Sequence, residues 1–188
     1  MRHLKLLCDE TSELVDMTHY GKIIGSLMYL ANTRTDICFV VNSLIEYLVK
    51  PRWVRLISVK HVMRYLKGTI DLGLYYGGDH DYNLHGYTDS DWVGSATDRK
   101  ITSSGCYCLG STMISWFSKK LSSISLSTAK ADYTASFSAC CEATWLRKLM
   151  SRIFDMEVDT IVIFCDNHIC IKMIENPVSH DKSKHIEI

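Results

Sequence analysis

The stretch Gly86-Tyr87-Thr88-Asp89-Ser90-Asp91-Trp92 decides how this chain is interpreted. Apolar and polar residues alternate around it, as in a half-buried strand, and two carboxylates stand at its end. Proteins bind hard divalent cations where such a strand-end carboxylate lies close to other carboxylates. Two later segments could supply them: the start of a long helical run, with Asp132, and an apolar strand that ends in Asp166.

The pattern after Gly78 predicts an α/β unit. Three strands, a long helix, a fourth strand and a short helix are expected, in that order. Their predicted ranges are residues 84–92, 105–109, 113–117, 127–153, 160–165 and 168–175. We expect the fourth strand to run parallel to the first, because a helical connection separates them from each other.

The pattern before Gly77 is helical from about Tyr20 to Lys67. Two runs separated by Pro51 carry apolar residues at helical spacing, namely Ile37, Val41, Leu44 and Leu48, then Leu56, Val59, Met63 and Leu66. Five aromatic residues are also expected at core positions: Tyr29, Tyr47, Tyr65, Trp116 and Trp145. The Gly77-Gly78 pair marks a turn-rich boundary, so two domains are predicted, residues 1–78 and 79–188.

The composition is that of a globular protein. Of 188 residues, 47% are hydrophobic and 22% charged, and the net charge of +0 supplies no overall field that attracts nucleic acid. We expect most of the eight cysteines to be small buried hydrophobic residues in a reducing compartment, namely Cys106, Cys108, Cys140, Cys141, Cys165 and Cys170. No zinc spacing, secretion signal or membrane span is recognisable, which predicts an intracellular protein of the cytoplasm or nucleus, not secreted.

In the predicted sheet, Asp89, Asp132 and Asp166 meet in one place. Mg²⁺ favours oxygen ligands, usually one or two carboxylates with waters and phosphate oxygens. Two such ions about 4 Å apart can activate a water and stabilise the leaving oxygen in phosphodiester hydrolysis. The spacing leaves a second interpretation open, because a strand-end aspartate is more often a cap or a turn residue.

Three blocks of the sequence resemble the ribonuclease H region of Ty1/copia-type retrotransposon polyproteins. They are Gly86-Tyr87-Thr88-Asp89-Ser90-Asp91-Trp92-Val93-Gly94 with Asp98-Arg99-Lys100; Ile114-Ser115-Trp116-Phe117-Ser118-Lys119-Lys120; and Cys165-Asp166-Asn167 with Asn176-Pro177-Val178 and Lys184-His185-Ile186-Glu187-Ile188. Upstream, Tyr20 to Leu30, Thr33 to Ile37 and Arg64 to Thr69 resemble the reverse transcriptase thumb and connection of the same polyproteins.

The resemblance implies a fold and an activity. The fold would be a ribonuclease H-like mixed sheet lacking its last strand, preceded by a small helical thumb and connection segment. The activity would be cleavage of the RNA strand of an RNA–DNA hybrid, with Mg²⁺ or Mn²⁺ held by four acids. By resemblance, the first three map to Asp89, Asp132 and Asp166, as catalytic residues and metal ligands. Asp91 competes with Asp89 for the first role. An RNA–DNA hybrid or another nucleic acid would be the partner.

Two departures from the family pattern point to little or no nuclease activity. The family carries glutamates where this sequence has Lys130 and Asp132, and the shorter carboxylate falls about 1 Å short, which can cost about a hundredfold in rate. The fourth acid and the fifth strand lie further downstream in the family, and Glu187 is a poor substitute. Polymerase activity is not expected, since no Tyr-x-Asp-Asp occurs.

Three functions therefore remain open. The first is a degenerate retrotransposon fragment with weak or absent catalysis, which we favour. The second is an active Mg²⁺-dependent hybrid nuclease that tolerates Asp132. The third is a non-enzymatic interaction or effector-like protein that reuses the scaffold, for which Arg2-His3-Leu4-Lys5 offers a faint similarity to an RxLR motif.

Overall fold

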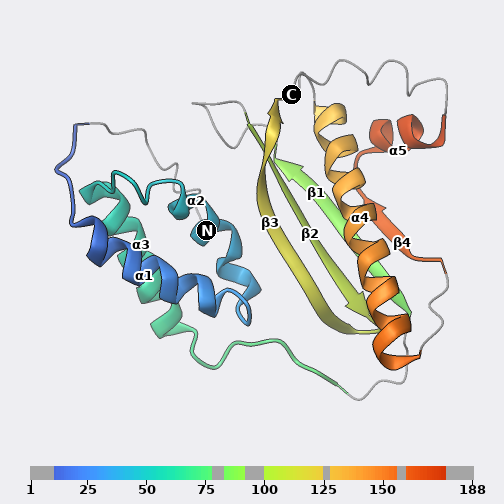
Figure 1. The fold of residues 1–188 in the computed structure, drawn as a ribbon, viewed down its shortest axis with the longest axis horizontal. Helices are drawn as coiled ribbons and strands as arrows, with labels where there is room; N and C mark the ends of the chain where they lie inside the picture. The colour runs from blue at the N-terminus through green and yellow to red at the C-terminus, as the bar shows by residue number, and fades with distance from the viewer. Residues whose placement is uncertain (1–10, 78–82, 92–99, 125–127, 156–159, 177–188) are drawn as a thin grey trace. The chain divides into compact units, whose positions relative to one another are not determined.

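The computed structural model describes residues 11–77, 83–91, 100–124, 128–155 and 160–176. Two compact units divide the chain, Met1–Leu74 and Tyr75–Ile188, whereas the sequence placed the boundary after residue 78. Figure 1 shows helices in the first unit and a sheet with helices in the second. Several sequence features lie outside the described residues: Arg2 to Lys5, Trp92 to Arg99, and everything from Pro177 onward, including Glu187.

The first unit is helical and is built around one aliphatic core. Its elements are α1 (Met17–Leu30), the short 3-10 helix η1 (Thr35–Ile37), α2 (Cys38–Ile45) and α3 (Trp53–Gly68). The Asp16 carboxylate accepts a hydrogen bond from the Thr18 N–H and so caps α1. The buried core consists of Tyr20, Ile24, Leu27, Ile37, Val41, Leu44, Leu56, Val59 and Val62.

Two side chains of this unit do not lie where the sequence predicted. Met63 is 48% exposed, and Val62 takes the buried position instead. Tyr29 is 82% exposed, because the buried stripe of α1 passes through Ile24 and Leu27 and leaves Tyr29 on the far side. Both positions were misassigned because the apolar residues of these helices are compatible with more than one buried face.

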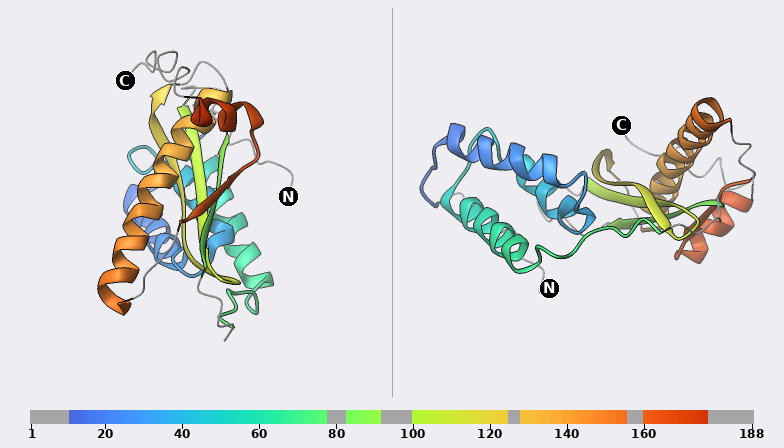
Figure 2. Two further views of the ribbon diagram at one scale, coloured as in Figure 1. Left: turned by 90° about the vertical axis from the view of Figure 1, so that its right-hand side faces the viewer. Right: turned by 90° about the horizontal axis from the view of Figure 1, so that it is seen from below.

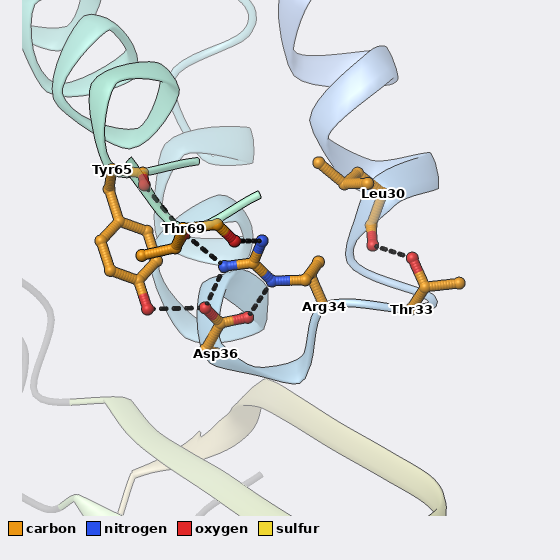
Figure 3. Close-up of polar contacts among 6 residues, drawn as sticks. All are labelled: Leu30, Thr33, Arg34, Asp36, Tyr65 and Thr69. Carbon is orange, nitrogen blue, oxygen red and sulfur yellow. Dashed lines mark hydrogen bonds and ion pairs between the residues drawn. The ribbon is translucent and has the colours of Figure 1, made fainter. Parts of the chain in front are cut away.

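A polar network centred on Arg34 ties the segment after α1 to the end of α3 (Figure 3). The Arg34 guanidinium donates to both carboxylate oxygens of Asp36, at 3.0 and 2.7 Å. It also donates to the carbonyl oxygen of Thr69 at 2.9 Å and to its hydroxyl at 2.8 Å. The Tyr65 hydroxyl donates to the same carboxylate at 2.7 Å. Arg34 thus holds the pKa of Asp36 below its usual range, chiefly through its hydrogen bonds.

The second unit contains a mixed sheet. Its strands are β1 (Leu84–Asp91), β2 (Lys100–Leu109), β3 (Thr112–Ile124) and β4 (Val162–Cys165), in the order β3-β2-β1-β4. Consecutive strands β1, β2 and β3 pair antiparallel, and β4 pairs parallel to β1. The predicted parallel pairing is confirmed, and the architecture is α/β and compatible with the ribonuclease H-like order that the resemblance implies.

Strands β2 and β3 are longer than the sequence predicted. They pair from Lys100 with Ile124 to Leu109 with Thr112, whereas the predicted strands covered only 105–109 and 113–117. The added positions are mostly serine, threonine and lysine, whose weak hydropathy contrast hides the alternation of a strand. Their strand conformation is set by pairing with the neighbouring chain segment instead.

The long helix α4 (Thr128–Phe154) lies along one face of the sheet, and the short helix α5 (His168–Glu175) follows β4 (Figure 2). Small residues allow the close approach: the alanines of α4 at every fourth position are buried, namely Ala131, Ala135, Ala139 and Ala143. The hydroxyl of fully buried Tyr107 donates to the Ala139 carbonyl oxygen at 2.6 Å. A methyl group on Gly86 would stand 2.7 Å from the Tyr107 ring, so only glycine fits there.

Three predicted core positions of this unit are exposed. Trp145 is 53% exposed, since Leu146 occupies the sheet-facing position of that turn. Cys140 and Cys141 are exposed as well, and only Cys170 among the described cysteines is fully buried. None of the helices in the described part of the chain combines the length and apolar character that a membrane crossing requires.

Candidate active site

Two of the predicted acids directly follow the last residue pair of the β1–β4 ladder. The last pair of the parallel ladder is Thr88 with Cys165; Asp89 follows within β1, and Asp166 follows just past the end of β4. Both acids are exposed. Because parallel strands end on the same edge of a sheet, their carboxyl ends form a common rim where ligands bind in open α/β sheets.

Asp132 lies near the start of α4, with 7% of its surface exposed. One of its carboxylate oxygens accepts a hydrogen bond from the Ser90 hydroxyl. The other accepts from the side-chain amide of Asn167, at 2.7 Å. Asp132 is therefore bonded to the residue that follows Asp89 and to the residue that follows Asp166.

Asn167 uses both ends of its side chain. Its amide nitrogen donates to Asp132, and its carbonyl oxygen accepts from the backbone N–H groups of Ile169 and Cys170 at 2.9 and 3.2 Å. The second pair of bonds caps α5. This double use fixes which way the amide points, since only the nitrogen can donate to a carboxylate.

Sequence reasoning missed the roles of Ser90 and Asn167. A signal was present for Asn167, because an asparagine just before a predicted helix is a typical N-cap. None was present for Ser90, whose partner lies 42 positions away. Both residues directly follow a predicted acid, which is the only pattern that links them.

The three predicted carboxylates do not form one group in the structure. Alternation along β1 turns Ser90 towards α4 and Asp89 to the opposite face, where Tyr87 is also exposed. Among the residues that the structure describes, no three His, Cys, Asp or Glu side chains come close enough together to hold a metal ion. The assignment of Asp89, Asp132 and Asp166 as catalytic residues and metal ligands stays a prediction.

Two carboxylates nevertheless fit the chemistry of Mg²⁺. The ion is usually held by one or two carboxylates, with waters and substrate phosphate completing the shell. Asp89 and Asp166 supply that number from the positions that follow the last β1–β4 pair, and both are exposed. The side chains of Asp91 and Lys130, which bear on the same site, lie outside the described part of the chain.

The thiol of Cys170 is close to Asp132 but is a poor nucleophile. The Cys170 sulfur is 3.6 Å from the Ser136 hydroxyl and is fully buried. Burial, more than any neighbouring charge, raises the pKa of this thiol to about 11. It is therefore protonated near neutral pH, and the thiolate that nucleophilic chemistry requires is scarce.

Comparison with known proteins identifies the family. The chain is 35% identical over 184 residues to the Retrovirus-related Pol polyprotein from transposon RE2 of Arabidopsis thaliana, covering 98% of this chain. It is 33% identical over 193 residues to that from transposon TNT 1-94 of Nicotiana tabacum, covering 99% of this chain. The chain belongs to the copia-type retrotransposon Pol polyproteins. The recognition made from the sequence motifs is confirmed.

The chain spans only a small part of those relatives, 13% of the RE2 polyprotein and 14% of the TNT 1-94 polyprotein. A third relative is short: Secreted RxLR effector protein 161 of Plasmopara viticola is 34% identical over 128 residues, which cover 68% of this chain and 90% of that protein. No family model matches the sequence. No solved structure matches it either.

Proposed function

We propose that this Pol-derived chain carries a ribonuclease H-like domain whose ancestor cleaved the RNA strand of RNA–DNA hybrids, and whose own catalysis is weak or absent. One observation carries the proposal: the β1–β4 register, whose last pair, Thr88 with Cys165, directly precedes Asp89 and Asp166. The relationship to Pol polyproteins supports it, because these acids lie in the blocks that resemble the ribonuclease H region.

In this proposal Asp89 and Asp166 hold Mg²⁺ or Mn²⁺ directly. Asp132, which the sequence assigned as a third ligand, acts only through its hydrogen bonds with Ser90 and Asn167. The bound ion would supply a polarised water for attack on an RNA phosphodiester. Asp132 accounts for the weak activity, since both of its oxygens are engaged by Ser90 and Asn167. A ligand displaced by about 1 Å can reduce a rate about a hundredfold.

The remaining parts of the proposal follow from the same relationship. The helical unit would be a remnant of the reverse transcriptase thumb and connection, and the nucleic-acid partner would be an RNA–DNA hybrid. The protein would act in the cytoplasm or nucleus, where such a hybrid forms. The net charge of the chain is +0, so no overall positive charge attracts the hybrid, and binding depends on local contacts and the cation.

The test is cleavage of an end-labelled RNA–DNA hybrid by the full chain in Mg²⁺ and in Mn²⁺. We expect slow cleavage or none, with any activity abolished by Asp89→Asn and by Asp166→Asn. Asp71→Asn, which changes an exposed acid of the helical unit, is the matched control and should leave it unchanged. Cleavage that survives both site variants would come from another source.

A thermal melt tests the site even where catalysis is absent. A ligand stabilises only the state that binds it, so millimolar Mg²⁺ should raise the melting temperature of the wild type and not of Asp89→Asn. A wild-type chain that neither responds to Mg²⁺ or Mn²⁺ nor binds the hybrid contradicts the proposal.

A non-enzymatic, effector-like role is the second candidate. The observation in its favour is that the similarity to Secreted RxLR effector protein 161 covers 90% of that protein. Secretion of a tagged chain from its own cells, with a phenotype that Asp89→Asn leaves intact, would support this role. Retention inside the cell would reject it.

A further inference from the structure

We infer that Ser90 and Asn167 are positioning residues: through Asp132 they set the placement of Asp89 and Asp166 for the cation. This inference rests on the proposed function and deepens it. It assigns to Asp132 the role of a bridge between two strand ends, held by a serine hydroxyl on one side and an asparagine amide on the other.

The Asp132 bridge lies just beyond the last residue pair of the β1–β4 ladder. The last register pair of the two strands is Thr88 with Cys165. Beyond it β1 stays paired with β2, because Asp89 faces Ser104 and Ser90 faces Ser103. Asp166 has already left β4, whose last residue is Cys165, so no ladder holds it beside β1. The hydrogen bonds that Asp132 accepts from Ser90 and Asn167 hold the two segments together instead.

Each bond of the bridge acts on the neighbouring acid through the backbone. Ser90 follows Asp89 and Asn167 follows Asp166, and consecutive Cα atoms are a fixed distance of about 3.8 Å apart. Asn167 is itself fixed, because its carbonyl oxygen caps α5. Moving either residue therefore changes the separation of the two acids.

Burial makes the bridge persistent. Only 7% of Asp132 is exposed, so an oxygen that loses its donor cannot be satisfied by bulk water. Leaving a buried acceptor unpaired costs more than the bond contributes in net terms. Residues that orient a metal site in this way typically change metal affinity when they are replaced.

The experiment measures the Mg²⁺ concentration at half-maximal thermal stabilisation of the full chain, and repeats the titration with Mn²⁺. Ser90→Ala removes one donor. Asn167→Ser removes the other and keeps an N-cap side chain of equal quality. Each should raise the midpoint about 10-fold. Ser90→Thr, which retains the hydroxyl, should restore the wild-type midpoint.

Ser138→Ala is the matched control, since this serine of α4 donates to the Thr134 carbonyl oxygen of its own helix and, among the described residues, has no bond to the bridge. Its midpoint should equal that of the wild type. Should Asn167→Ser give no cooperative melt, the comparison of Ser90→Ala with Ser90→Thr decides, because Ser90 lies at the half-exposed end of its strand.

The outcomes separate the inference from the proposed function. Variants that melt at lower temperature without ions but keep the wild-type midpoint show a merely structural role and overturn the inference alone. A tighter midpoint in Ser90→Ala also overturns it, because Asp132 would then be a direct ligand with which Ser90 competes. A wild-type chain that does not respond to either ion removes the proposed function, and the inference with it.

Discussion

Two aspartates tie distant segments together in the two units, and their partners differ in charge. In the helical unit, Asp36 receives the Arg34 guanidinium on both oxygens and the Tyr65 hydroxyl on one. In the sheet unit, Asp132 receives the Ser90 hydroxyl and the Asn167 amide. The geometry is similar, but the second carboxylate is held by neutral donors.

The two carboxylates differ in how their charge is compensated. A carboxylate bonded to a guanidinium is compensated in charge, and the pair stabilises the fold. The Asp132 carboxylate is 7% exposed, and among the described residues its hydrogen-bond donors are neutral. Burying such a charge is costly unless a cation compensates it. The Asp36 carboxylate is thus compensated within the helical unit, whereas the donors that Asp132 has among the described residues bring no positive charge.

The largest effect is expected from Asp36→Asn. The new amide cannot accept from the guanidinium on both sides, and its nitrogen opposes the Arg34 donors. Losing hydrogen bonds to a charged group should destabilise the helical unit by about 2 kcal/mol. Urea denaturation, followed by hydrogen exchange of peptides from α3, measures this change. Asp71→Asn, at an exposed site, is the control and should have no effect. If the helical unit of Asp36→Asn is as stable as that of the wild type, the Arg34–Asp36 pair does not stabilise the fold.

Asp132→Asn should cost less, under about 1 kcal/mol without ions. The variant loses one acceptor but also replaces a buried carboxylate whose described donors are neutral, and the two terms oppose each other. In millimolar Mg²⁺ the gap should widen, because the ion should bind the wild type more tightly than the variant and so stabilise it more. The same denaturation on peptides of α4 tests both statements. A loss equal to that of Asp36→Asn in the absence of ions would break the comparison.

The sheet unit was predicted from the sequence where local pattern and topology agree. The strand that holds Asp89, the long helix that holds Asp132, and the parallel strand that leads to Asp166 all have a clear period of their own. Their connection then dictates a parallel pair. The far ends of β2 and β3 were missed, because serine and lysine positions there acquire strand structure from their partners.

The site was predicted less completely, for a physical reason. Sequence motifs locate acids on elements, but they do not show which oxygens are already engaged. The bond from Ser90 to Asp132 spans 42 positions and depends on how α4 lies on the sheet. The exposed Trp145 has the same cause, because one step along α4 separates it from buried Leu146.

A smaller effect is expected from acidification. The Asp36 pKa is lowered in the folded chain, chiefly by its hydrogen bonds from Arg34. Its contribution to stability is therefore complete above the unfolded pKa of about 3.9, and is lost as the pH falls through the lower folded value. Urea midpoints of the helical unit between neutral and strongly acidic pH should fall less steeply in Asp36→Asn than in the wild type. Parallel curves would show that Asp36 is not responsible.

The smallest effect separates two serines on the same face of the sheet. Ser103 pairs with Ser90 across β1 and β2 and is fully buried, yet within the described residues its hydroxyl has no hydrogen-bond partner. Ser103→Ala removes an unsatisfied polar group and should be neutral or stabilising by about 0.5 kcal/mol. Ser90→Ala instead leaves an oxygen of Asp132 without its donor and should be destabilising by about 1 kcal/mol.

Urea denaturation of both variants, read from peptides of α4, decides the matter. Equal losses would mean that Ser103 also serves Asp132 in solution, and the buried carboxylate would then have three donors instead of two. The difference between Asp132 and Asp36 would then be smaller, because an additional hydrogen-bond donor stabilises a carboxylate even without a cation. Opposite signs would leave Ser90 as the hydroxyl whose hydrogen bond the buried Asp132 carboxylate requires.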